Sequence, residues 1–422
     1  MTAPAVSTST STGTFRALAN RNFRLWSAGG IVSNVGTWMQ RTAQDWLVLT
    51  ELAHVNGASA VGVVMALQFG PLALLLPFTG FAADYFDRRR LLFCTQAASG
   101  LLALGLGLLT VLELVQLWHV YIFAFLLGCV AAFDSPARQT FIGELVGEVD
   151  LANAVALNST SFNAARMIGP AVAGVMITAV GTGWVFLLNA ASFVAVIGSL
   201  CLLRPADFQS RVRAVRSRGS LVEGFRYVWR RPDLLAVLLM LFLIGAFGLN
   251  FPIFISTMSV HAFQAGSGEY GVLSSTMAIG SVAGALLAAR RAAPSVPLLI
   301  GAALLFGAGC ALAAVMPTTW TFGAVLVIIG VAAQTFTTSS NSLVQLSTDS
   351  AMRGRVVALL LAIGVGGTPL GAPVVGWVAD VAGPRWALGV GAASGLLAAL
   401  VGVRYLVKQR RQRPATAIKT AA

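Results

Sequence analysis

The sequence predicts an all-α membrane protein with twelve transmembrane helices in two pseudo-symmetric six-helix bundles. Hydrophobic residues make up 57% of the 422 positions, charged residues make up only 10%, and the mean hydropathy is +0.81. Apolar stretches of about 20 residues, the length that crosses the hydrocarbon core of a bilayer, recur along the chain. Lys and Arg cluster in every second loop between these stretches, which is the positive-inside pattern of polytopic helical proteins.

The charge pattern predicts the topology. All but four of the 28 Lys and Arg residues fall on one side of the predicted spans. The clusters are Arg16, Arg21 and Arg24; Arg88, Arg89 and Arg90; eight residues from Arg204 to Arg231; Arg290 and Arg291; Arg353 and Arg355; and the tail 404–419. The alternate loops contain no Lys or Arg, and Arg385 is the one cation on that side. We therefore expect a multi-pass protein of the cytoplasmic (plasma) membrane with both termini in the cytoplasm. Contact between basic loops and anionic lipid explains the formal charge of +13 without a nucleic-acid partner.

The apolar runs, taken in order, divide the chain into five parts. The predicted spans are 22–50, 59–83, 91–112, 118–145, 151–180 and 184–203, then 233–259, 269–289, 295–316, 320–346, 353–381 and 385–407. They give a disordered cytoplasmic tail (1–21), an N-terminal bundle (22–203), a cytoplasmic linker (204–232), a C-terminal bundle (233–407) and a basic cytoplasmic tail (408–422). In the linker, Val222, Phe225, Val228 and Trp229 recur near helical spacing beside arginines, which predicts a short helix lying on the membrane surface.

The two halves share a residue pattern at an offset of roughly 202 positions. The matches are Pro170 with Pro373, Gly174 with Gly376, Gly181 with Gly383, Trp184 with Trp386, and Ser192 with Ser394. Such a shared offset indicates parallel repeats about an axis normal to the membrane, with a substrate path between them.

The loop between the second and third spans contains Gly80, Asp84, Arg88, Arg89 and Arg90. The arginines alone fit a plain cytoplasmic anchor, but a carboxylate at the membrane edge needs a partner. The candidate partners of Asp84 are Arg138, near the cytoplasmic end of the fourth span, and the N-terminus of the eleventh helix.

This loop resembles the signature cytoplasmic loop of the major facilitator superfamily, commonly written G-x-x-x-D-R-x-G-R-R. Tyr85 and Asp87 depart from that pattern. The segments NFRLW at 22–26, GTWMQ at 36–40, FDSPAR at 133–138 and ALN at 156–158 resemble the enterobactin-exporter branch of the superfamily. The resemblance implies that Asp84 and Arg138 belong to a gating latch that holds the outward-open state.

In the fifth span, Gly169, Pro170 and Gly174 form a segment similar to the Gly-Pro motif of drug/proton antiporters in the superfamily. Pro170 frees a backbone carbonyl, and the two glycines permit close helix packing, so we expect a kinked, bendable helix. Ordinary packing of small residues is the alternative explanation.

Charged residues inside the spans are candidates for the translocation path, because each costs roughly 2.5–3.5 kcal/mol to insert into a membrane. Arg41 and Asp45 lie one turn apart, which permits a salt bridge on one helix face, whether structural or functional. Asp134 and Arg166 are the deeper charges and differ in depth by ~8 Å, so Arg138 could hold Asp134 instead. The polar residues that could line a cavity are Asn34, Gln40, Gln44, Asn163, Asn250, Gln334, Asn341 and Gln345.

The sequence shows no nucleotide-binding loop, metal-ligand cluster or nucleophile–base pattern, so we expect a transporter without a cofactor rather than an enzyme. The prediction is a secondary active transporter, a monomer, that exports a small amphipathic organic compound such as a siderophore or drug. It works by alternating access and uses the proton gradient as its energy source. Asp134 or Asp45 carries the proton in this hypothesis, which depends on the resemblance because the superfamily's Arg-x-x-Gln-Gly motif has no match. An importer on the same scaffold and a non-transporting receptor or assembly protein are the alternatives.

Overall fold

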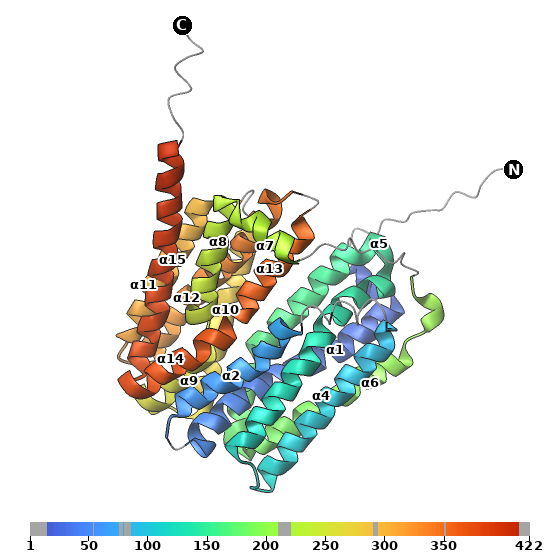
Figure 1. Ribbon diagram of the computed structural model, residues 1–422. Helices are drawn as coiled ribbons and strands as arrows, with labels where there is room; N and C mark the ends of the chain where they lie inside the picture. Colours follow the sequence, from blue (N-terminus) through green and yellow to red (C-terminus); the bar gives the residue numbers. More distant parts are fainter. Residues whose placement is uncertain are drawn as a thin grey trace, which may run out of the picture.

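The computed structural model describes residues 15–53, 55–75, 79, 86–209, 221–289, 294–349 and 352–412. Every regular element in these segments is a helix (Figure 1). The first half contains η1 (Arg16–Ala19), α1 (Arg21–Leu47), η2 (Val48–Leu52), α2 (Gly57–Leu74), α4 (Arg88–Val111), α5 (Leu117–Val180) and α6 (Thr182–Leu202). The linker contains η3 (Pro205–Asp207) and α7 (Leu221–Trp229). The second half contains α8 (Pro232–Leu243), η4 (Ile244–Gly248), α9 (Phe251–Thr257), η5 (Met258–Ala262), α10 (Ser267–Ala289), α11 (Val296–Ala314), α12 (Thr319–Ser347), α13 (Arg353–Gly366), α14 (Thr368–Ala382) and α15 (Pro384–Gln412).

These helices account for the twelve predicted crossings. Ten helical segments of the described chain are long and apolar enough to cross a membrane. One of them, α5, supplies two crossings, because its helical conformation is broken at Gly147, where φ is +71° and ψ is −176°. The more polar α1, with 27 residues, completes the set. The twelve-helix fold expected from the sequence is therefore confirmed.

Two crossings that the sequence predicts as continuous spans are interrupted. The seventh crossing changes from α8 to the wider turn of η4 and restarts at α9, and the eleventh breaks between α13 and α14. Pro252 and Pro369 lack the amide hydrogen that would continue each helix. The two interruptions meet, since a Cβ atom added to Gly371 would overlap the carbonyl of Ala246. Such discontinuous helices are typical of binding sites near the middle of transporters.

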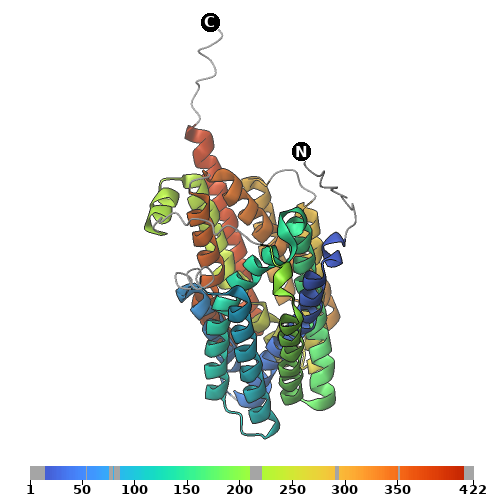
Figure 2. The same cartoon turned by 90° about the vertical axis from the view of Figure 1, so that its right-hand side faces the viewer.

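The helices form two bundles that pack side by side, as the two views of Figures 1 and 2 show. In the first half α1 packs on α5 and α6, and α4 packs on α6, while in the second α10 packs on α12 and α11 packs on α15. The main contacts between the bundles are α2 with α14 and α5 with α10. We call the end that carries η1, α7 and the last turns of α15 the basic end, at the top of Figure 1, and the other end the distal end.

The backbone repeats between the halves at the positions that the sequence pattern matches. Gly181, after α5, has φ of 88° and ψ of 167°, and Gly383, after α14, has φ of 99° and ψ of 165°. Positive φ is readily adopted only by glycine, which explains why both turns use it. The fifth and eleventh crossings are therefore equivalent elements of a duplicated fold.

The outer surface of the bundles is apolar. Leu101 and Val194 are each 67% exposed, and Trp377 is 59% exposed. A surface with this many exposed large hydrophobic side chains fits lipid rather than water. The helix predicted in the linker is present as α7, which packs on α13 and exposes Val222, Phe225 and Trp229.

Candidate functional site

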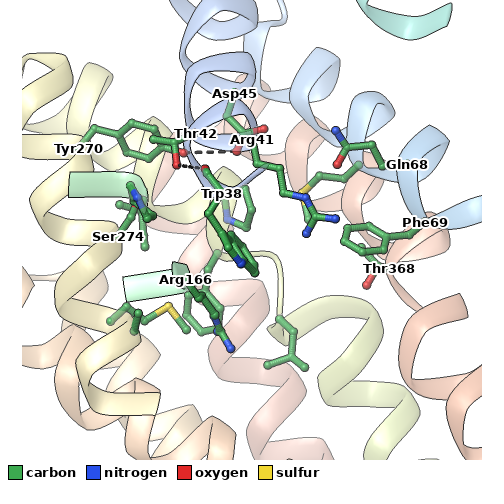
Figure 3. A pocket seen from close by; sticks show the side chains of 18 residues that line it. Trp38, Arg41, Thr42, Asp45, Gln68, Phe69, Arg166, Tyr270, Ser274 and Thr368 are labelled. Atoms are coloured by element: carbon green, nitrogen blue, oxygen red, sulfur yellow. Dashed lines mark hydrogen bonds between the residues drawn. The ribbon is translucent and has the colours of Figure 1, made fainter. Parts of the chain in front are cut away.

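A central pocket of about 210 Å³ lies where the two bundles meet (Figure 3). The first half contributes Trp38, Arg41, Thr42, Asp45, Met65, Gln68, Phe69, Arg166 and Pro170. The second half contributes Leu249, Phe251, Pro252, Ile255, Tyr270, Ser274, Met277, Ala278 and Thr368. Several of these second-half residues lie at the interruptions of the seventh and eleventh crossings, so the broken helices shape this pocket. The pocket combines aromatic walls with a few charged groups, as small-molecule sites commonly do.

Two arginines in the central pocket contact aromatic rings. The guanidinium carbon of Arg41 lies 5.0 Å from the ring centroid of Trp38 and 5.6 Å from that of Phe69. That of Arg166 lies 5.8 Å from the Trp38 centroid, and Figure 3 shows both side chains beside this indole. Among the described residues, no ion pair joins Arg41 to Asp45, so the salt bridge that their spacing permits is not formed. Cation–π contact with two rings holds Arg41 away from that carboxylate.

Asp45 connects the two halves. The side chain is 8% exposed, and its Oδ2 accepts a hydrogen bond from the hydroxyl of Tyr270 in α10 at 3.4 Å. The ring of Tyr270 stacks on Trp46 with 5.8 Å between centroids. A change in the charge of Asp45 therefore acts directly on a contact between the bundles.

Asp134 has different surroundings from Asp45. Its Oδ1 accepts hydrogen bonds from Thr95 Oγ1 and Gln96 Nε2 at 2.7 Å each. Its Oδ2 accepts one from Arg138 Nε at 3.1 Å, which is also an ion pair. Of the two partners considered from the sequence, the structure therefore places Arg138 on Asp134, while Arg166 lies in the central pocket.

In a second cavity of about 830 Å³, which we call the N-half cavity, all the described lining residues lie between Ser33 and Phe193. It shares Arg41, Gln68 and Phe69 with the central pocket and reaches Asp134 and Arg138. Amide side chains line it, including the predicted Asn34, Gln40, Gln44 and Asn163. Gln44 is 1% exposed, and neither polar atom of its side chain has a hydrogen-bond partner among the described residues. A buried amide without partners indicates a place where a ligand or water belongs.

At the start of α4, in the gating loop expected from the resemblance, Arg88 and Arg89 contact neighbouring helices of the first half. Arg88 forms an ion pair with Glu144, and Arg89 donates from Nε to the carbonyl of Leu200 at 3.0 Å. Cations suit the carbonyl end of a helix such as α6. Asp87 caps α4 by accepting from the backbone amide of Arg90 at 2.8 Å. Gly80 and Asp84 lie outside the described residues.

The Gly-Pro segment lies at close helix contacts. A Cβ atom at Gly169 would lie 2.6 Å from the Trp38 Cβ, so this glycine allows the indole to sit against α5. A Cβ atom at Gly174 would lie 2.6 Å from the Ser267 carbonyl, and the Pro170 carbonyl faces Gly271 of α10. The segment therefore positions one wall of the pocket and one contact between the bundles.

Gln334 and Asn341 lie apart from the site. Gln334 donates to Thr338 Oγ1 at 3.1 Å, and Asn341 donates to the Thr337 carbonyl at 3.0 Å, so both bond within α12. Neither lines the central pocket or the N-half cavity.

Sequence reasoning missed a carboxylate at the distal end. Asp380 of α14 accepts from the backbone amides of Ala58 at 3.0 Å and Ser59 at 2.7 Å, and from the Ser59 hydroxyl at 2.5 Å. It thus caps the N-terminus of α2, whose own N-cap residue, Asn56, makes no side-chain cap. We call this contact the distal latch, since it ties the bundles together. The available sequence signal was an acidic residue three positions before Gly383, the glycine that ends α14.

The equivalent position in the first half holds an uncharged residue, which makes a second contact between the bundles. Thr178 occupies the position in the first half that Asp380 occupies in the second, and its hydroxyl lies 2.8 Å from that of Ser267 in α10. With the Asp380 and Thr178 contacts formed, the distal end is closed where α2 packs on α14 and where α5 packs on α10. We call these two contacts between the bundles the distal seams.

Comparison with known proteins agrees with this architecture. The family model described as "Transmembrane secretion effector" matches residues 12–419. The chain belongs to this family of the major facilitator superfamily. It is a multi-pass membrane transporter and not an enzyme, as the sequence predicted.

Relatives and solved structures extend over most of the chain. The staphyloferrin A transporter of Staphylococcus aureus is 27% identical over 83% of this chain and 87% of its own length. The multidrug efflux pump Tap of Mycolicibacterium fortuitum is 27% identical over 84% and 88%, and the enterobactin exporter EntS of Escherichia coli is 26% identical over 86% and 87%. A bacterial homolog of the lysosomal transporter Spinster, solved inward-facing and occupied, has a TM-score of 0.71 at 14% identity, covering 96% of this chain and all of that one. That likeness shows the fold.

Proposed function

We propose that the protein exports a small amphipathic organic compound, of the siderophore or drug class, across the cytoplasmic membrane in exchange for protons. The observation that carries the proposal is the central pocket, which both bundles line and in which charged and aromatic side chains meet. The names of relatives in the family include a siderophore transporter, a siderophore exporter and a drug efflux pump, which supports export. Both termini lie in the cytoplasm in this proposal, so the basic end is the cytoplasmic end.

We expect alternating access to use the two main contacts between the bundles, α2 with α14 and α5 with α10. With the distal latch made, the central pocket is closed toward the outside and receives substrate from the N-half cavity, which extends toward the basic end. Export requires the distal seams to part while the basic end closes. The gating loop would act at that step, with Arg88 and Arg89 already tied to the first half.

Asp45 is the better candidate for the proton carrier. Asp134 has an arginine and two further donors, and protonation would leave the arginine without its charge partner. Asp45 has one long hydrogen bond, shares the pocket with the substrate and contacts the second half. An ionised Asp45 accepts a hydrogen bond from a hydroxyl or amine of the substrate. A proton that arrives from outside binds Asp45, displaces that hydrogen bond and so releases the substrate.

A deletion strain tests the proposal in two steps. Compounds retained by cells that lack the gene are identified by mass spectrometry, and the retained compound is then offered to inside-out vesicles with an acidified lumen. Vesicles with the native protein should accumulate it, and vesicles with Asp45→Asn should accumulate it no faster than protein-free vesicles. Uptake only by right-side-out vesicles would support an importer and contradict export. Accumulation by Asp45→Asn that still follows the pH gradient would remove Asp45 as the carrier.

A further inference from the structure

The central pocket has an excess of positive charge. Among the described residues that line it, Arg41 and Arg166 are cations and Asp45 is the one carboxylate. Neither guanidinium forms a hydrogen bond or ion pair with any side chain that the structure describes, and both make only ring contacts. The ten donors of two guanidinium groups are far more than the pocket's few acceptors can satisfy.

Such unsatisfied charge needs a counter-charge. A cation held inside a membrane protein is stabilised by a partner or by water, and these two arginines share one indole instead of a carboxylate. A second guanidinium beside the first also raises the energy of the empty pocket, because like charges in surroundings of low dielectric constant repel strongly. An anion placed between the two arginines removes both penalties together.

We propose that the substrate bears an acidic oxygen group, a carboxylate or phenolate, which binds Arg41 and Arg166 while its ring stacks among Trp38, Phe69 and Phe251. This inference depends on the export function proposed above and names the substrate class of the same pocket. Arg166 of α5 and Arg41 of α1 both belong to the first half, so that half holds the acidic group.

The cavities also set the size and the remaining polarity of the substrate. The central pocket of about 210 Å³ is too small for a drug-sized molecule, but it adjoins the N-half cavity of about 830 Å³, with which it shares Arg41, Gln68 and Phe69. There the unpartnered amide of Gln44 offers a donor and an acceptor. Asp45 accepts a hydrogen bond from a hydroxyl or amine of the same molecule. Substrate and proton therefore still compete for this carboxylate, as the proposed exchange requires. The substrate is therefore an extended acidic aromatic compound with hydrogen-bond donors.

Charge selection is tested by binding alone, with one ring system in three charge states. Purified protein in nanodiscs is dialysed to equilibrium against 1-naphthoate, its methyl ester and 1-naphthylmethylamine, with empty nanodiscs as the blank. The native protein should prefer the naphthoate anion. Arg166→Gln and Arg41→Gln should each weaken naphthoate binding by roughly tenfold or more, the effect of losing a charge-assisted hydrogen bond, and should change ester binding little.

Two further variants separate charge from folding. Arg166→Lys should recover part of the naphthoate affinity, and Arg385→Gln, at the distal end where the side chain donates to the Ala314 carbonyl, should change nothing. Equal losses for all three probes, a preference for the amine, or no binding above empty nanodiscs would overturn the proposal. This measurement involves neither a proton gradient nor transport. A failed transport assay would therefore refute the export function, and only the binding results above would refute the acidic substrate.

Discussion

The distal latch should set the balance between the closed and open states of the distal end. Replacing Asp380 by Ala removes the acceptor of the Ala58 and Ser59 amides and of the Ser59 hydroxyl. Loss of an N-cap side chain costs about 1 kcal/mol, and loss of the hydroxyl bond costs about 1 kcal/mol more. The closed state should therefore lose about 2 kcal/mol, which shifts the equilibrium roughly 30-fold toward opening.

The shift is measurable as a distance between the bundles. In a cysteine-free background, spin labels at Leu114 and Trp320, which are 60% and 80% exposed at the distal end of the two halves, report their separation. Pulsed electron resonance should show a longer-distance population grow in Asp380→Ala. Thr178→Ala removes the equivalent neutral contact, worth about 1 kcal/mol, and should shift the balance roughly fivefold. Unchanged distances in a monodisperse Asp380→Ala protein would refute the latch, as would an equal or larger effect of Thr178→Ala.

Three further substitutions test the packing and the charges of the first half and of the seam. Asp134→Asn should lower thermal stability and protein yield, because Arg138, one helical turn away, loses its charge partner. An unaltered melting temperature would contradict a structural role for Asp134. Gly271→Ala should destabilise the protein or open the distal end, since its Cβ would overlap a carbonyl of α5. Gly301→Ala, where nothing lies within 4 Å, is the matched control for that melting curve. Asn22→Ala should lower the free energy of unfolding by about 1–3 kcal/mol, because this buried side chain accepts a hydrogen bond from the backbone amide of Arg204 and donates one to its carbonyl, two residues beyond the end of α6. A melting curve that matches the native protein would refute this.

The sequence predicts the crossings well because membrane thickness and loop charge constrain every one of them. It also predicts that the halves are equivalent, and the matching conformations of Gly181 and Gly383 bear this out. The breaks at η4 and before α14 were missed, although Gly245, Gly248 and Pro252 were visible as signals, because hydropathy averages over them. Local composition therefore gives the number and order of helices but not their interruptions.

Pairing within the site depends on contacts that sequence spacing does not contain. The spacing of Arg41 and Asp45 permits a salt bridge, but two aromatic rings from α1 and α2 hold the guanidinium instead. Asp134 receives two of its three donors from α4, about 38 residues away. The Asp380 cap joins groups 321 and 322 residues apart. Each of these arrangements exists only once the bundles have packed.

The polarity of α1 has a consequence for how the protein is made. Among the described helices, α1 does not reach the apolarity of a membrane span, because it carries the charged and amide side chains of the site. A nascent chain that has emerged only this far gives the translocon a poor insertion signal, since each charge at mid-depth opposes entry into lipid. Stable insertion of α1 must wait for α5 and α6, the helices on which it packs most extensively. Glycosylation mapping of truncated chains would measure this delay, and full insertion of α1 by itself would disprove it.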